Sequence, residues 1–131
     1  MKNRKILTGL GVGVASVALA LGTSTASFAG SDGPTVCNSD PQTACVWFHQ
    51  DGDIVYVKDM NCDGHSAVAR VEVPAAGIYE NLWNTDGCGS TDHKQYGTQI
   101  PEGDRVYYKA CFGVYSTGAI SNCSSIGSGV A

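Results

Sequence analysis

Cys45-Val46-Trp47-Phe48-His49, the turn Gln50-Asp51-Gly52-Asp53, and Ile54-Val55-Tyr56-Val57-Lys58 together decide the fold class. Two runs rich in β-branched and aromatic residues flank an Asp-Gly turn, and such a turn favours a hairpin because it accepts positive φ. The stretch therefore predicts two antiparallel strands.

The rest of the chain repeats this pattern of short apolar runs separated by Gly, Pro, Asn and Asp. Residues 66–73 alternate, with Ala67, Ala69, Val71 and Val73 on one side. No period of 3.6 residues persists for more than two turns, so helices are not expected. Further strands are predicted over 66–73, 78–84, 104–112 and 119–123, the last returning through Ser116-Thr117-Gly118. We expect a small antiparallel β-sandwich or open barrel of about six strands.

Two segments are predicted to be irregular. Residues 85–103 carry Gly87, Gly89, Gly97 and Pro101, which disfavour a strand, and long irregular connections often carry function. The Ser/Gly-rich tail over 124–131 is expected to be frayed.

The N-terminus has the parts of a secretory signal peptide. Lys2, Arg4 and Lys5 precede an uncharged stretch over 6–21, and Ser27-Phe28-Ala29 offers a small-x-small cleavage site. The apolar run is shorter than the roughly 18 to 20 residues that span a bilayer. We expect residues 1–29 to be removed and residues 30–131 to form a single secreted, extracellular β domain, free of the membrane and monomeric.

Charge excludes some partners. The whole chain has a formal net charge of −4. After residue 29 five basic residues stand against twelve acidic ones, which leaves an acidic domain of net charge −7. Such a surface repels phosphate backbones and anionic headgroups, so nucleic acid and membrane surfaces are not expected partners.

Six cysteines follow the signal segment, and in an exported chain they predict three disulfides that stabilise a small core. Fifteen pairings are possible. Proximity along the chain favours Cys37 with Cys45, Cys62 with Cys88, and Cys111 with Cys123. No C-x-x-C pair is present and the histidines are scattered, so no metal site or cofactor is expected.

Candidate chemistry is sparse. Residues 59–64, Asp-Met-Asn-Cys-Asp-Gly, match the first half of a calcium loop, but Arg70 stands where the bidentate Glu belongs. An ordinary turn, in which Asn and Asp cap their own backbone and Gly64 takes positive φ, is the favoured interpretation. His65 or His93 with a nearby Ser or Asp would suit a hydrolase, yet no nucleophile signature accompanies them, and no catalytic residue is assigned.

Aromatic side chains are the more promising functional feature. In an alternating strand, adjacent rings point to opposite faces, so some must face outward unless both faces are covered. An outward row suits stacking on sugars or anchoring a protein. The predicted interaction surface comprises the loop over 85–103 and five side chains: Trp47, Trp83, His93, Tyr96 and Tyr107.

The motifs Cys62-Asp63-Gly64-His65-Ser66-Ala67, Leu82-Trp83-Asn84 and Ile100-Pro101-Glu102-Gly103, followed by Val106-Tyr107-Tyr108-Lys109, resemble the small secreted disulfide-bonded proteins of filamentous actinobacteria. The similarity spans about residues 54–125. That family has no assigned activity, so the resemblance implies an exported all-β fold and transfers no site; the Cys37/Cys45 arm is then an addition to its four cysteines.

Three functions remain open. The leading one is a non-enzymatic binding module for an extracellular protein or glycan, most concretely a hydrolase inhibitor. The alternatives are a small secreted hydrolase and a structural cell-envelope protein.

Overall fold

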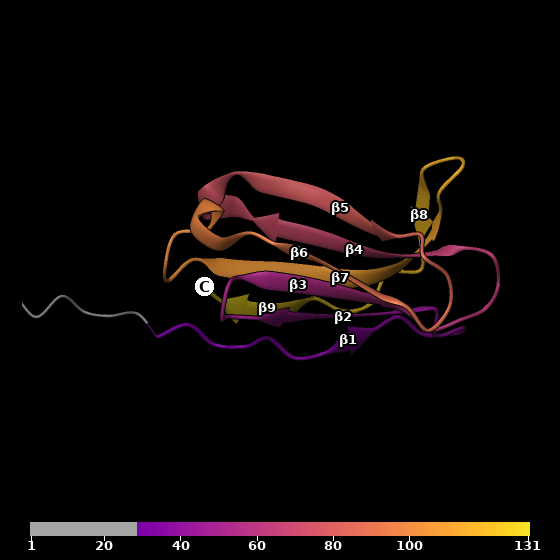
Figure 1. Ribbon diagram of the computed structural model, residues 1–131, viewed down its shortest axis with the longest axis horizontal. Coiled ribbons are helices and arrows are strands. Elements are labelled where there is room, and N and C mark those ends of the chain that lie inside the picture. The colour runs from indigo at the N-terminus through magenta and orange to yellow at the C-terminus, as the bar shows by residue number, and fades with distance from the viewer. Residues whose placement is uncertain (1–28) are drawn as a thin grey trace, which may run out of the picture.

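The computed structural model describes residues 29–131, which form two antiparallel sheets packed face to face (Figure 1). The expected signal segment lies outside the described residues, apart from Ala29. The fold is an all-β sandwich, as predicted, and the sheets do not close into a barrel. In the described part of the chain, no helix is long and apolar enough to cross a membrane.

The first sheet has the order β1-β2-β3-β6. The predicted hairpin forms β2 and β3, and both Gly52 (φ 86°) and Asp53 (φ 52°) adopt the left-handed conformation that the turn requires. Its strands are β1 (Val36–Cys37), β2 (Ala44–His49), β3 (Ile54–Asp59) and β6 (Thr91–Gln95).

The second sheet has β4 at its centre, between β5 and the long strand β7. Two short strands, β8 and β9, pair with opposite ends of β7. The strands are β4 (Ser66–Val73), β5 (Ile78–Asn84), β7 (Arg105–Val114), β8 (Ala119–Ser121) and β9 (Gly127–Val130); short 3₁₀ helices η1 (Pro74–Ala76) and η2 (Gly97–Gln99) precede β5 and follow β6.

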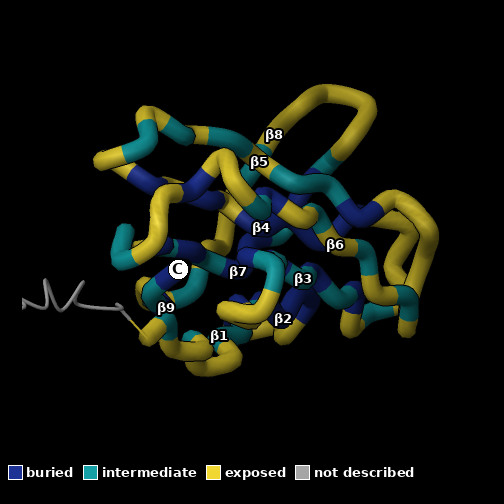
Figure 2. Tube along the Cα trace, turned by 60° about the vertical axis from the view of Figure 1, so that its left-hand side comes forward, coloured by how far each residue is buried: buried dark blue, intermediate teal, exposed yellow. Residues whose placement is uncertain are grey.

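The core lies between the sheets and comes from alternate residues of the long strands. Figure 2 shows buried segments along the central strands and exposed ones in the loops. The predicted inward row of β4 is buried, and it faces the inward side chains of β2 and β3. The main members are Val46, Phe48, Val55, Val57, Val71, Val73, Val106 and Tyr108.

The C-terminal tail corrects one prediction. It is not frayed: β9 pairs with residues 105–108 of β7, and Ala131 is buried. Gly127 and Gly129 allow this because a Cβ on either would lie 2.4 Å from a ring carbon of Tyr108 or Phe48. The glycines therefore permit close packing of the backbone on aromatic rings.

Residues 85–103 correct another. The prediction of an irregular loop is wrong, since Thr91–Gln95 form β6 and pair along β3, with His93 opposite Tyr56. Apolar alternation could not predict this strand because all five of its residues are polar. As the edge strand of its sheet it contributes charged side chains rather than core residues.

All six cysteines are paired as proximity favoured: Cys37 with Cys45, Cys62 with Cys88, and Cys111 with Cys123. The first bond joins residues directly opposite each other in β1 and β2. The second links the turn after β3 to the turn after β5, and the third links β7 to the segment after β8. All three bonds lie toward the same end of the sandwich, where β2 and β4 begin and β3 and β5 end.

Candidate functional site

The five predicted contact residues do not form one surface. Trp47 and His93 lie on the outer face of the β1-β2-β3-β6 sheet, whereas Trp83 and Tyr107 lie on the outer face of the other sheet. Tyr96 is only 3% exposed, so the prediction that it faces a partner is wrong. The structure therefore presents separate candidate sites on opposite faces.

Tyr96 has a structural role. Its hydroxyl donates a hydrogen bond to Glu80 Oε1, and Lys94 Nζ donates to both carboxylate oxygens of Glu80 at 2.7 and 2.8 Å. Glu80 belongs to β5 and Lys94 to β6, so these three residues, here called the edge clamp, join the two sheets. Burial acts to raise the pKa of Glu80, but the hydrogen bonds from Lys94 and Tyr96 and the charge of Lys94 outweigh it and hold that pKa below its usual value.

An aromatic row crosses the outer face of the first sheet. Trp47, Tyr56 and His93 are cross-strand neighbours on β2, β3 and β6. The Trp47 and Tyr56 rings are stacked, with centroids 5.2 Å apart and planes within 8°, and Tyr56 and His93 are 5.6 Å apart. Stacked cross-strand rings stabilise a sheet, and they also hold the row in one geometry. Tyr56 was absent from the predicted surface.

The hairpin tip, defined as residues 115–119, is the most prominent projection. Figures 1 and 2 show the segment between β7 and β8 standing clear of the sandwich. All five residues are exposed, and Tyr115 is 66% exposed. The tip is convex, so it suits insertion into a concave partner.

The conformation of the hairpin tip is fixed by its own backbone hydrogen bonds and by a disulfide at the base of the hairpin. The amides of Thr117 and Gly118 donate to the Val114 carbonyl at 3.2 and 2.9 Å, and Gly118 takes φ 72°. The Cys111–Cys123 disulfide closes the base. Rigid display of this kind lowers the entropy lost on binding.

Trp83 supports the same hairpin. Its ring meets Tyr115 edge-on, with centroids 5.5 Å apart. Gly113 makes room for it, since a Cβ there would lie 2.5 Å from both Trp83 Cζ3 and Val68 Cγ2. Trp83, one of the predicted contact residues, thus braces the projection, while Tyr115 at its tip was not among the predicted five.

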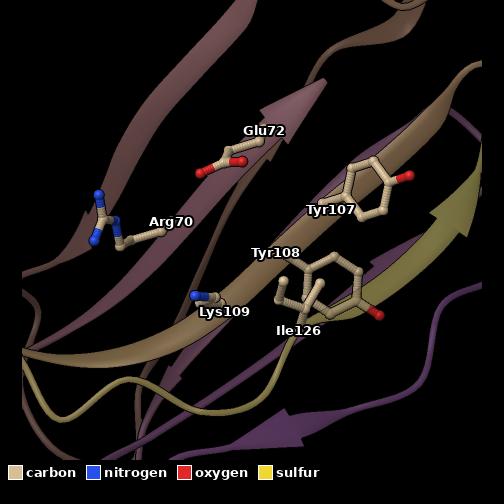
Figure 3. A pocket seen from close by; sticks show the side chains of 6 residues that line it. All are labelled: Arg70, Glu72, Tyr107, Tyr108, Lys109 and Ile126. Carbon is tan, nitrogen blue, oxygen red and sulfur yellow. The ribbon is translucent and has the colours of Figure 1, made fainter. Parts of the chain in front are cut away.

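Tyr107 lies beside a pocket of about 270 Å³ on the outer face of the β4–β7 pair. Figure 3 shows its lining side chains, which include two basic residues that are not among the five predicted contact residues. The lining comprises Arg70, Glu72, Tyr107, Tyr108, Lys109 and Ile126.

The calcium-like turn behaves as an ordinary turn. The Asn61 amide donates to Asp59 Oδ1 at 3.0 Å, the His65 amide donates to Asp63 Oδ1 at 2.9 Å, and Gly64 takes φ 75°. These are the backbone-capping bonds that the favoured interpretation predicted. Within residues 29–131, no three His, Cys, Asp or Glu side chains are grouped closely enough to hold a metal ion.

The histidines are dispersed over the surface. His65 Nδ1 lies 3.6 Å from Asp63 Oδ1 and its ring packs against Phe112, while His93 packs against Tyr56. No Ser or Thr hydroxyl in the described part of the chain hydrogen-bonds an imidazole. The paired nucleophile and base that a triad needs is not assembled there.

Asp53 is the most unusual acid. It is buried in the β2–β3 turn, and its Oδ1 atom has no hydrogen-bond partner. Burial, and secondarily the charge of Glu102, raise its pKa.

No family model matches this chain, and no curated protein or solved structure matches it either. Inference about function therefore depends on the geometry of the surfaces described above.

Proposed function

We propose that this protein is a secreted, non-enzymatic binding module that inserts its hairpin tip into a concave site of an extracellular protein, most specifically as an inhibitor of an extracellular hydrolase. The observation that carries the proposal is the projecting hairpin, which the Cys111–Cys123 disulfide closes at its base and which exposes Tyr115 at its tip. Hydrolase active sites are concave, and a rigid convex loop is the complementary shape.

Secretion is supported by the chemistry of the cysteines. Three disulfides persist in oxidising compartments and are rare where thiols are kept reduced. They also stabilise a chain of about 100 residues against extracellular proteases, each by roughly 2 to 4 kcal/mol.

The test uses the oxidised chain from residue 30 onward. Glycoside- and peptide-hydrolysing activities of a culture supernatant from the producing organism are measured with and without the protein. We expect one activity to fall, and Y115A to weaken that inhibition by at least about tenfold, because exposed aromatic anchors dominate interfaces.

The matched control is Y79A. Tyr79 is 64% exposed and lies on the outer face of the same sheet, on β5 and outside the hairpin tip. Y79A should inhibit like the parent protein. Equal weakening by Y115A and Y79A, or no inhibited activity at all, would contradict the proposal.

The aromatic row supports a second candidate, binding of a glycan on the opposite face. Trp47, Tyr56 and His93 form a fixed row. Among the described residues, the Trp47 ring stacks on one aromatic ring, that of Tyr56. Affinity electrophoresis through neutral polysaccharides tests it: retardation that W47A abolishes and Y115A leaves intact would support a glycan site independent of the hairpin tip.

A further inference from the structure

Two cations occupy directly opposed positions on the outer surface of the second sheet. The antiparallel register of β4 and β7 places Arg70 directly opposite Lys109. Like charges at directly opposed positions destabilise a sheet. Only five basic residues follow residue 29, against twelve acidic ones, so this juxtaposition is unusual for the composition.

Neither cation is paired with an acid among the residues that the structure describes. Among residues 29–131, the ion pairs within 4.0 Å are His49–Asp32, His65–Asp63 and Lys94–Glu80, and none includes Arg70 or Lys109. Glu72 lies two residues after Arg70 on the same face of β4 and is opposite Tyr107. Glu72 is therefore not directly opposite either cation.

The two cations border the pocket of about 270 Å³ (Figure 3). Tyr107 and Ile126 supply its apolar wall, and Ile126 is 60% exposed despite its size. Glu72 supplies an acceptor at the rim. The volume is below that of typical drug-sized sites, so it suits a ligand of about one ring.

From these features we propose that Arg70 and Lys109 form a binding site for the carboxylate of an acidic sugar, with the sugar ring against Tyr107. A carboxylate placed between the cations accepts charge-assisted hydrogen bonds from both and removes their repulsion. The apolar face of a sugar ring matches Tyr107, and its hydroxyl groups donate to Glu72. A simple aliphatic acid would leave Glu72 without a donor.

This site is independent of the hairpin tip, and it does not rest on the proposed function. The experiment titrates the oxidised, isotope-labelled protein with glucuronate and follows backbone amide shifts by NMR. Glucose, which lacks the carboxylate, and acetate, which lacks the ring, are titrated in parallel. We expect saturable shifts centred on residues 70–72 and 107–109 with glucuronate, and binding at least about tenfold weaker for each of the other two.

Variants separate a binding role from a structural one. R70Q and K109Q should each weaken glucuronate binding by about tenfold or more and should raise the melting temperature of the free protein, because each removes the repulsion. K109R should retain binding. R105Q is the matched control: Arg105 is on the same face of β7, contacts Ser128 Oγ at 3.4 Å and does not line the pocket.

Several outcomes would overturn the proposal. Glucose binding as tightly as glucuronate would remove the role of the carboxylate, and acetate binding as tightly would remove the role of the ring. An R105Q effect equal to that of R70Q would show only a response to net charge. No saturable shift with glucuronate would exclude the site.

Discussion

Replacing Gly129 by Ala tests why the C-terminal strand packs as it does. The new Cβ would lie 2.4 Å from Phe48 Cδ1, 2.8 Å from the Ser31 carbonyl oxygen and 3.0 Å from the Gly33 nitrogen. Ordinary carbon contacts begin near 3.5 Å, so roughly 1 Å of movement is needed. Phe48 is buried in the core, and the other two atoms belong to backbone.

The expected cost follows from two opposing effects. Overpacking a filled core costs about 1–3 kcal/mol, while the loss of glycine's freedom in the unfolded chain returns about 0.4–1 kcal/mol. We expect G129A to lower the free energy of unfolding by about 1–2 kcal/mol. For a domain of this size that lowers the melting temperature by roughly 5–15 °C.

Urea denaturation of the oxidised protein, followed by tryptophan fluorescence, measures this change. S128A is the matched control, because Ser128 lies between the two glycines and, among the described residues, its side chain makes a single hydrogen bond, the 3.4 Å contact with Arg105. It should change stability by less than about 0.5 kcal/mol. Unchanged or increased stability of G129A would refute the account of β9 as a strand that requires close approach to Phe48.

Three further predictions concern charge and cross-links. The edge clamp lowers the pKa of Glu80, so the stability that this carboxylate contributes is present above its pKa in the unfolded chain and is lost as pH falls through its pKa in the folded protein. E80Q should therefore lower the melting temperature at neutral pH and approach the parent protein in acid. A difference in melting temperature between E80Q and the parent that stays constant across pH would contradict this. The effect of Asp53 on stability has the opposite sign, because burial makes its charged form costly and so raises its pKa. D53N should therefore melt at a higher temperature than the parent at neutral pH and lose that advantage in acid. A lower melting temperature of D53N at neutral pH would count against this prediction. Loop closure predicts that replacing the Cys62–Cys88 bond by alanines, with a separation of 26 residues, costs about 3.5 kcal/mol, against about 2.8 for Cys111–Cys123 and about 2.5 for Cys37–Cys45, with separations of 12 and 8; denaturation of the three double variants measures the order.

The parts of the fold that sequence could predict are those with local signals. The Asp-Gly hairpin, the alternation over 66–73 and the turn before Gly118 all appear where their patterns placed them. The disulfides also follow proximity, because each joins segments that lie close along the chain.

The elements that sequence could not predict depend on distant partners. The β9 strand has glycine where strands usually carry bulky residues, and only the rings of Tyr108 and Phe48 beneath it explain that choice. The β6 strand has no apolar alternation because Lys94 meets Glu80 of the other sheet. The sequence around Tyr96 suggests an exposed aromatic residue, whereas its hydroxyl donates a hydrogen bond to the same Glu80 carboxylate and its ring is buried.

The candidate sites show the same division. Outward aromatic residues could be found by alternation, which identified Trp47, Trp83 and Tyr107. The pairing of Arg70 with Lys109 depends on the register of strands about 40 residues apart, and no local pattern sets that register. Tyr115 was missed because a turn residue belongs to no alternating row.

Site-specific photo-crosslinking tests the central claim most directly. A benzophenone amino acid is placed at position 115 or, as the control, at position 79, and each protein is irradiated in the producing organism's culture supernatant. The account predicts a crosslink from position 115, and not from position 79, to a secreted hydrolase whose activity the unmodified protein inhibits. Equal crosslinking from both positions, or none from position 115 while an inhibited hydrolase is retained by the protein, would contradict insertion of the hairpin tip.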